Sequence, residues 1–263
     1  MTRRLPVVVF SDVDRVLHYP GTPSWIQAAK ALKRLESARV PLILCSRQTR
    51  AEIERIQQVL EIHHPFVCES GGAAFVPSGY FEFQVQSARD VAGYQAVEFG
   101  RPYPDVVRTL RRTADRLRID ISVFSDMSVE DVARECSLPL LQARLAKLRE
   151  YSERFLVLDA VDKTRTRLFG ALKTEGLRCI AVERYDQVGG PATNNVGVNL
   201  LRTLYERAHG PVIAVGLADA AADDTFLDVA DRRVMVSDDT RAQGGIDVAG
   251  WAEAIVDIVE ELH

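Results

Sequence analysis

Two carboxylates separated by one residue, Asp12 and Asp14, follow the apolar run PVVVF at residues 6–10. Such a run is typical of a strand buried on both faces of a parallel sheet. In an open α/β sheet the ligand crevice lies outside the carboxyl ends of the strands. Two acids this close repel each other unless a proton or a cation lies between them, and a hard cation such as Mg2+ suits such oxygen ligands. Taken alone, the pair also fits a plainer interpretation, a strand followed by an acidic turn.

The elements around this pair alternate between strand and helix patterns. After the first strand we expect a helix over about 24–38, a buried strand over 40–45 that ends at Ser46, a helix over about 49–60 and a short strand over 66–68. This order predicts a parallel sheet with right-handed crossovers.

The pattern changes from residue 79 onward. Short alternating runs over 81–86 are followed by charged amphipathic helices, predicted at 103–117 and 142–151, with strands between and after them. Such a stretch fits an α+β insertion. The core pattern resumes after Gly189 and Gly190 with a helix over about 196–208, a strand over 212–215, a last strand over 233–236 and a closing amphipathic helix. The strand over 212–215 leads into a loop that carries Asp219 and Asp223.

Composition and charge argue against several classes of protein, namely nucleic-acid-binding, secreted, membrane and zinc-binding proteins. The chain has 263 residues, 47% of them hydrophobic and 27% charged, with a net charge of −4. The arginines are scattered, so we expect no nucleic-acid partner. Carboxylates interrupt the apolar start too early for a signal peptide or membrane span, and we expect a cytoplasmic protein without a membrane partner. Four cysteines lie far apart without a C-x-x-C pair, which favours reduced thiols over a zinc site. The sequence leaves the oligomeric state open.

Three polar clusters therefore follow strands of the expected core: the Asp12/Asp14 pair, Ser46, and the Asp219/Asp223 pair. Each alone fits a helix cap or a turn. Together they favour a metal and phosphate site. With these residues the chain resembles the haloacid dehalogenase superfamily of phosphotransferases. That superfamily has an acidic pair after the first strand, Ser or Thr after the second, a lysine, and a late G-D-x-x-x-D motif.

Longer segments resemble the mannosyl-3-phosphoglycerate phosphatase branch of that superfamily, among them VFSDVDRVL, LILCSRQTRAEIE, ARLAKLREYSE and VGLADAAADD. The resemblance implies a Rossmann-like α/β core over residues 1–78 and 189–263, with an inserted α+β cap domain over 79–188. It also implies an Mg2+-dependent phosphomonoester hydrolase. The expected substrate is a small phosphorylated sugar or glycerate, with mannosyl-3-phosphoglycerate as the first candidate.

The resemblance assigns roles to the strand-end residues. Asp12 is expected to be the nucleophile that forms an aspartyl-phosphate, and Asp14 the general acid and base. Ser46 is expected to donate a hydrogen bond to a phosphate oxygen. Asp12, the Asp14 carbonyl, Asp219 and Asp223 are expected to hold Mg2+.

Substrate contacts are expected mainly in the cap. The predicted substrate-binding residues are Arg47, Arg149, Glu150, Tyr151, Glu153 and Arg184. For the cap members, a solvated helix face with one aromatic anchor is an equally open interpretation.

Two departures from the superfamily pattern bear on catalysis. Arg15 stands where a glycine is usual, and Asn194 stands at the position expected for the lysine. Asparagine cannot carry that lysine's positive charge. In one hypothesis Arg15 or Arg47 supplies the missing cation, and in another the chain binds a sugar phosphate without efficient turnover. Retention of the acids favours an enzyme with an altered third motif. A purely structural module would call for an extended apolar surface or a heptad pattern, and the sequence has neither.

Overall fold

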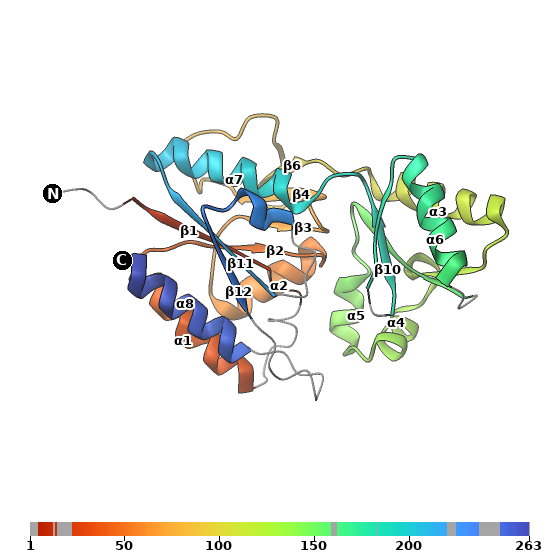
Figure 1. Cartoon of the computed structure of the whole chain (residues 1–263), viewed down its shortest axis with the longest axis horizontal. Helices are drawn as coiled ribbons and strands as arrows, with labels where there is room; N and C mark the ends of the chain where they lie inside the picture. Colours follow the sequence, from red (N-terminus) through yellow and green to blue (C-terminus); the bar gives the residue numbers. More distant parts are fainter. Residues whose placement is uncertain are drawn as a thin grey trace.

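The computed structural model describes residues 5–12, 14, 23–158, 162–182, 184–219, 225–236 and 248–262. Its elements form two sheets (Figure 1). The larger sheet has eight strands in the order β12-β11-β1-β2-β3-β4-β6-β5, and the smaller has four in the order β7-β8-β10-β9. Figure 1 shows each sheet with its own helices, at opposite ends of the long axis of the molecule.

The larger sheet consists of β1 (Val7–Asp12), β2 (Leu42–Cys45), β3 (Phe66–Cys68), β4 (Ala73–Pro77), β5 (Arg89–Val91), β6 (Tyr94–Glu98), β11 (Ile213–Asp219) and β12 (Arg232–Val236). Its helices are α1 (Pro23–Ser37), α2 (Arg50–Leu60), α7 (Asn194–His209), α8 (Val248–Leu262) and the 3-10 helix η2 (Thr225–Val229). The five strands from β12 to β3 run parallel, and β4, β6 and β5 add an antiparallel edge.

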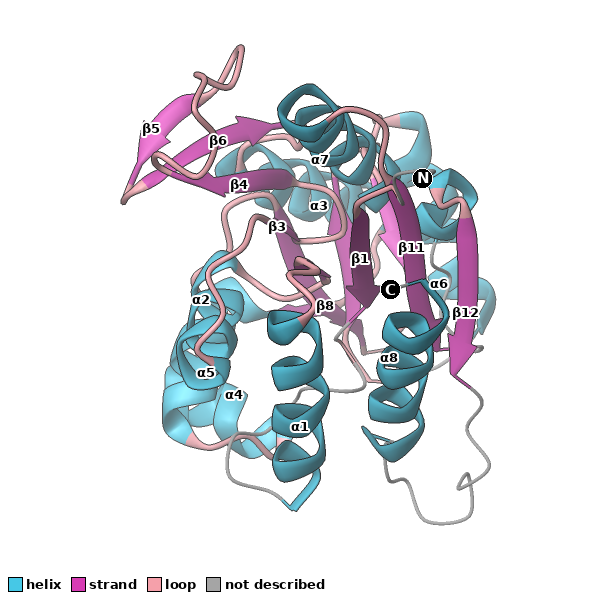
Figure 2. Ribbon diagram, turned by 90° about the vertical axis from the view of Figure 1, so that its left-hand side faces the viewer, coloured by secondary structure: helices cyan, strands magenta, loops and turns pink. Residues whose placement is uncertain are grey.

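β1 lies in the middle of the parallel strands, hydrogen-bonded to β11 on one side and to β2 on the other. All six of its residues are buried, because helices cover both faces of the sheet (Figure 2). Val7 and Val9 pack toward α1, α2 and α8, whereas Val8 and Phe10 pack toward α7. The expected Rossmann-like core is confirmed.

The smaller sheet consists of β7 (Ile121–Val123), β8 (Ser152–Val157), β9 (Arg178–Ile180) and β10 (Asp186–Gly189). Its helices are α3 (Tyr103–Leu117), α4 (Val129–Cys136), α5 (Leu140–Ala146), α6 (Asp162–Thr174) and the 3-10 helix η1 (Phe124–Asp126). All of its strand pairs are antiparallel. α3 and α6 pack on this sheet in one apolar cluster, and α4 and α5 pack together in another, around Phe124 and Tyr185.

Residues 81–86, whose apolar residues alternate in the sequence, form an irregular loop from which Phe81 and Val85 bury their side chains. Two expectations are corrected by the structure. β5 and β6 lie in the range predicted for the cap but extend the larger sheet. The predicted helix over 142–151 is wrong in its second half, because α5 ends at Ala146 and β8 begins at Ser152. The helix α6 had no counterpart among the sequence-based predictions.

Glycine packing draws the two sheets together. Phe99 and Gly100 both donate backbone hydrogen bonds to the carbonyl of Gly72, at 2.9 and 2.8 Å. A Cβ at Gly72 would lie only 2.6 Å from the Cβ of Tyr151. Real Cβ atoms do not approach this closely, so the chain passes here only because residue 72 has no side chain. The larger sheet is thereby held against the segment that precedes β8.

Candidate active site

The predicted acidic pair lies at the carboxyl end of β1. Asp12 is the last residue of the strand, and its Oδ1 accepts a hydrogen bond from the backbone amide of Asp14 at 2.8 Å. Both residues are buried. The preceding Ser11 donates to the Asp12 carbonyl and accepts from Nε1 of Trp251 in α8, each at 2.9 Å. The buried indole of Trp251 therefore helps to hold the carboxyl end of β1 in place.

Asp14 meets the loop that follows β2. Ser46 Oγ donates to Oδ1 of Asp14. The backbone amide of Arg47 donates to both carboxylate oxygens, at 3.0 and 2.9 Å, and Arg47 Nε donates to Oδ2 at 2.7 Å. This convergence follows from the parallel pairing of β1 with β2, in which Asp12 is opposite Cys45. The structure thus brings Asp14 and Ser46 together at one edge of the sheet, and their catalytic roles stay predictions.

These donors determine the charge of Asp14. Burial by itself raises the pKa of this carboxyl, but the positive charge of Arg47 and the hydrogen bonds from Ser46 and Arg47 outweigh it, so the pKa is lowered overall. The group is therefore held as a carboxylate. Asp14 can therefore donate a proton only after it has first taken one up.

The metal-ligand prediction is only partly covered by the described residues. Asp219 ends β11, and Ser11 pairs with Leu217 in the parallel β1–β11 ladder, so Asp12 and Asp219 end neighbouring strands at one edge. Oxygen ligands at such an edge fit a hard cation such as Mg2+. No group of three metal-ligating side chains is present among the described residues. The side chain of Asp219, and all of Asp223 and Arg15, lie outside them.

Asn194, the residue predicted at the lysine position, is the first residue of α7. Its Oδ1 is buried and has no hydrogen-bond partner among the residues that the structure describes. The adjoining backbone passes close to Gly71, where a Cβ would lie 2.2 Å from the Thr193 carbonyl carbon and 2.7 Å from the Asn194 amide nitrogen. Gly71 has a φ of +93°. The start of α7 is thus pressed against the turn that follows β3.

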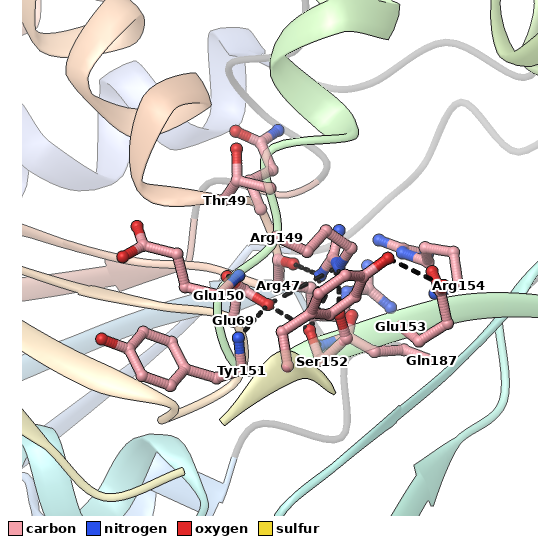
Figure 3. Close-up of polar contacts among 12 residues, drawn as sticks. Arg47, Thr49, Glu69, Arg149, Glu150, Tyr151, Ser152, Glu153, Arg154 and Gln187 are labelled. Carbon is pink, nitrogen blue, oxygen red and sulfur yellow. Dashed lines mark hydrogen bonds and ion pairs between the residues drawn. The ribbon is translucent and has the colours of Figure 1, made fainter. Parts of the chain in front are cut away.

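Glu69, in that same turn, joins the two sheets. Its carboxylate accepts hydrogen bonds from the backbone amides of Glu150 at 2.7 Å and Tyr151 at 3.2 Å, and from the Ser152 hydroxyl (Figure 3). Arg149 Nε lies 3.6 Å from the same carboxylate. The side chain of Glu69 is completely buried. It satisfies backbone amides that a continued helix would have paired with its own carbonyls, which explains why the predicted helix ends early.

Arg149 and Glu150 also contact residues that belong to the helices and loops around the larger sheet. Arg149 donates to the carbonyl of Arg47 at 2.9 Å and to the Ser152 hydroxyl at 2.8 Å. Glu150 forms an ion pair of 2.8 Å with Arg50 of α2. Both residues therefore lie at the junction of the two sheets. Their role toward a substrate stays a prediction.

The remaining predicted cap residues have protein partners as well. The Tyr151 hydroxyl donates to Glu98 at 2.6 Å, and burial together with that carboxylate raises the pKa of Tyr151. Glu153 is fully buried and accepts from the Tyr103 hydroxyl at 2.9 Å. Arg184 forms an exposed ion pair with Glu135. A direct substrate contact by any of them would require it to exchange one of these partners.

One charged residue near Asp14 had no place in the sequence-based prediction. Arg154 of β8 lies close enough to Arg149, Arg47 and Asp14 for their charges to act on it. Burial and the two neighbouring arginines lower the pKa of Arg154 to about 10. The alternation of β8 puts Arg154 and Ser152 on the same face of the strand. The docking of the two sheets brings Arg154 near Asp14, which the sequence does not reveal.

Known proteins resemble this chain over nearly its whole length. A protein from Methanococcoides burtonii named glucosyl-3-phosphoglycerate/mannosyl-3-phosphoglycerate phosphatase is 29% identical over 264 residues, covering 96% of this chain and 97% of its own. A protein of the same name from Persephonella marina is 28% identical, covering 98% of both chains. No family model matches the chain. A haloacid dehalogenase-like hydrolase structure from Bacteroides thetaiotaomicron superposes with a TM-score of 0.61 at 14% identity, covering 96% of this chain and 99% of that one.

The chain therefore has the fold of the haloacid dehalogenase superfamily, as its strand-end residues predicted. Within that superfamily, its full-length resemblance is to proteins named glucosyl-3-phosphoglycerate/mannosyl-3-phosphoglycerate phosphatase. Among the helices that the structure describes, none combines the length and hydropathy needed to cross a lipid bilayer.

Proposed function

We propose that this protein is a phosphatase that hydrolyses a glycosyl-3-phosphoglycerate, with the glucosyl and mannosyl esters as the candidate substrates. The observation that carries the proposal is the buried Asp12/Asp14 pair at the end of β1, with Ser46 of the neighbouring strand bonded to Asp14. The names of the two curated relatives supply the substrate class.

The roles follow from the positions of the two acids. Asp12 would attack phosphorus, so that an Oδ–P bond forms while the bond from phosphorus to the ester oxygen breaks. Asp14, two residues further on, would take up a proton as the phosphate ester binds, give it to that oxygen, and later take one from the water that releases phosphate. The single hydroxyl hydrogen of Ser46, which is donated to Asp14 in the structure, would be redirected to a phosphoryl oxygen when the substrate binds. Splitting the reaction at an aspartyl-phosphate lets one pair of acids serve both steps.

The residues at this edge suit Mg2+. Asp12, the Asp14 carbonyl, Asp219 and Asp223 are the proposed ligands, and their oxygens match the preference of a hard cation. Bound there, Mg2+ would supply positive charge beside the phosphoryl oxygens.

Arg47 is the proposed substitute for the lysine expected at Asn194. Its guanidinium contacts Asp14, and its side chain is 27% exposed. A cation at this position would steady the charge that develops on the transferring phosphoryl group. Arg15, the other candidate, lies outside the described residues.

The experiment is phosphate release from glucosyl- and mannosyl-3-phosphoglycerate with Mg2+ and with EDTA. We expect metal-dependent turnover by the wild type and none by Asp12→Asn, which keeps the size of the side chain but not its nucleophilic charge. Binding of either ester without release by the wild type would instead make this chain a sugar-phosphate binding protein.

A further inference from the structure

Arg154 is a partly buried arginine whose guanidinium contacts no acidic side chain among the residues the structure describes. Its side chain donates one hydrogen bond, from Nη1 to the carbonyl of Tyr185 at 3.3 Å. It forms no ion pair with any acidic side chain in the part of the chain that the structure describes. Arginines in such positions are usually paired, because an isolated buried charge is costly.

The two arginines beside it are engaged elsewhere. Arg47 Nε is bonded to Asp14, and Arg149 to Ser152 and the Arg47 carbonyl. Figure 3 shows Arg47, Arg149 and Arg154 gathered where the strand β8 faces the larger sheet. The charges of Asp14 and Glu52 act on Arg154 from a distance, yet neither forms an ion pair with it. The guanidinium therefore lies near Asp14, and among the described residues only its Nη1 has a hydrogen-bond acceptor, the Tyr185 carbonyl.

The proposed reaction determines which part of the substrate lies near Asp14 and Arg154. The ester oxygen that leaves phosphorus must come within hydrogen-bond reach of Asp14, since this residue is its proposed proton donor. In a 3-phosphoglycerate ester that oxygen is attached to C3, and the carboxylate carbon C1 is separated from C3 by C2 alone. The carboxylate therefore lies within a few ångströms of the oxygen that Asp14 serves. A cation near Asp14, but not bonded to it, is suitably placed to meet this carboxylate.

We propose that Arg154 binds the substrate carboxylate and makes the site selective for phosphate esters of a hydroxy acid over phosphates that lack the acid. This inference rests on the proposed phosphatase function and adds the residue that recognises the acid half of the substrate. Guanidinium and carboxylate match as a planar, two-bond pair, which gives both affinity and orientation. In this proposal the selectivity comes from β8 in the cap, whereas the two reacting acids lie at the end of β1.

A matched pair of ligands tests the proposal by calorimetry. 3-Phosphoglycerate and sn-glycerol 3-phosphate have the same phosphate on the same three-carbon chain, and only the first carries a carboxylate. We expect the wild type to bind 3-phosphoglycerate about 10-fold to 100-fold more tightly, the span that one charge-assisted contact typically contributes. In Arg154→Gln the two ligands should bind within about threefold of each other. An undiminished preference in Arg154→Gln overturns the proposal, as does a wild type with no preference.

Two further variants keep the result interpretable. Arg154→Lys keeps the charge but not the two-bond geometry, so its preference should fall between those of the wild type and Arg154→Gln. If Arg154→Gln does not fold, an Arg154→Lys preference equal to that of the wild type overturns the proposal. Arg111→Gln removes an arginine of α3 that pairs with Asp126 on the exposed surface, and should behave as the wild type.

The two proposals fail separately. Absence of phosphate release by the wild type would defeat the phosphatase function, yet the carboxylate preference would still be measured directly by binding. Turnover with an unchanged carboxylate preference in Arg154→Gln would defeat only the role of Arg154.

Discussion

The Nε atom of Arg47 lies 2.7 Å from Oδ2 of Asp14, and the backbone amide of the same arginine donates to both oxygens of that carboxylate. Arg47 thus orients Asp14, the proposed general acid and base, and also places a positive charge beside it. We expect Arg47→Ala to lower kcat about 100-fold to 1000-fold, as the loss of a charge-stabilising donor does elsewhere. Arg47→Lys should lose less, because it restores the charge.

The comparison is made by steady-state phosphate release at saturating Mg2+, with circular dichroism to verify folding. Turnover of Arg47→Ala at the wild-type rate would remove Arg47 as the substitute for the expected lysine.

The Glu69 carboxylate predicts a stability effect at the junction of the two sheets. In Glu69→Gln the side-chain NH2 group would face the hydrogen-bond donors of Tyr151 and Ser152. The buried Arg149 would also lose its carboxylate partner. Loss of one partner from a buried, hydrogen-bonded pair costs about 3 kcal/mol or more. Urea unfolding should show this loss. The matched control is Arg89→Ala, which breaks the more exposed Arg89–Glu98 pair and should cost far less. Equal effects of the two variants would contradict the role given to Glu69.

Much of the site was predictable because the carboxyl ends of parallel strands share one edge. The convergence of Asp14 with Ser46 follows from the order of strands along the chain, and it is present. Contacts across the junction were not predictable in this way. The segment 149–151 has a helical pattern, but the amides of Glu150 and Tyr151 bond to Glu69, which is distant in sequence. A tertiary acceptor overrode local propensity there.

Similar limits explain the other differences. Residues 81–86 alternate like a strand, yet Phe81 and Val85 are buried from a loop over α7. In the sequence Arg154 resembles any exposed residue of a strand with alternating side chains. Its proximity to Asp14 depends on how the two sheets dock. The assignments of Arg15 and Asp223 lie outside the described residues, so their roles stay predictions.

Two helical glycines predict opposite effects of the same substitution. A Cβ at Gly197 of α7 would lie 2.7 Å from Cγ2 of Val67, so Gly197→Ala should destabilise the fold through overpacking, by about 1–3 kcal/mol. A Cβ at Gly170 of α6 would meet no atom within 4 Å, so Gly170→Ala should stabilise by up to about 1 kcal/mol through helix propensity. Thermal unfolding of the two variants measures this. Stabilisation by Gly197→Ala would contradict the packing of α7 on β3.

His64 predicts a pH dependence of stability. Its Nδ1 lies 2.8 Å from the Tyr80 hydroxyl, which in turn lies 2.7 Å from that of Tyr205. Burial, with a smaller contribution from His63, lowers the pKa of His64 from 6.5 to about 4. Between these values the unfolded chain binds a proton that the folded chain does not, so stability falls as the pH drops from about 6.5 to 4.

Below about pH 4 both states carry the proton, and the loss attributable to His64 is complete, at no more than about 3 kcal/mol. We expect His64→Gln to flatten this part of the curve of unfolding free energy against pH. His209→Asn, which replaces an exposed histidine of α7, should leave it unchanged. A wild-type curve that His64→Gln does not alter would contradict the burial of this ring as a neutral group.

The most direct test of the central claim is Mg2+-dependent phosphate release from glucosyl- and mannosyl-3-phosphoglycerate by the wild type and by Asp12→Asn. The proposed mechanism predicts turnover by the wild type, loss of turnover in EDTA, and none by Asp12→Asn although that variant still binds the ester. Release at an equal rate by Asp12→Asn would contradict the assignment of Asp12 as nucleophile, and no release by the wild type would contradict the phosphatase itself.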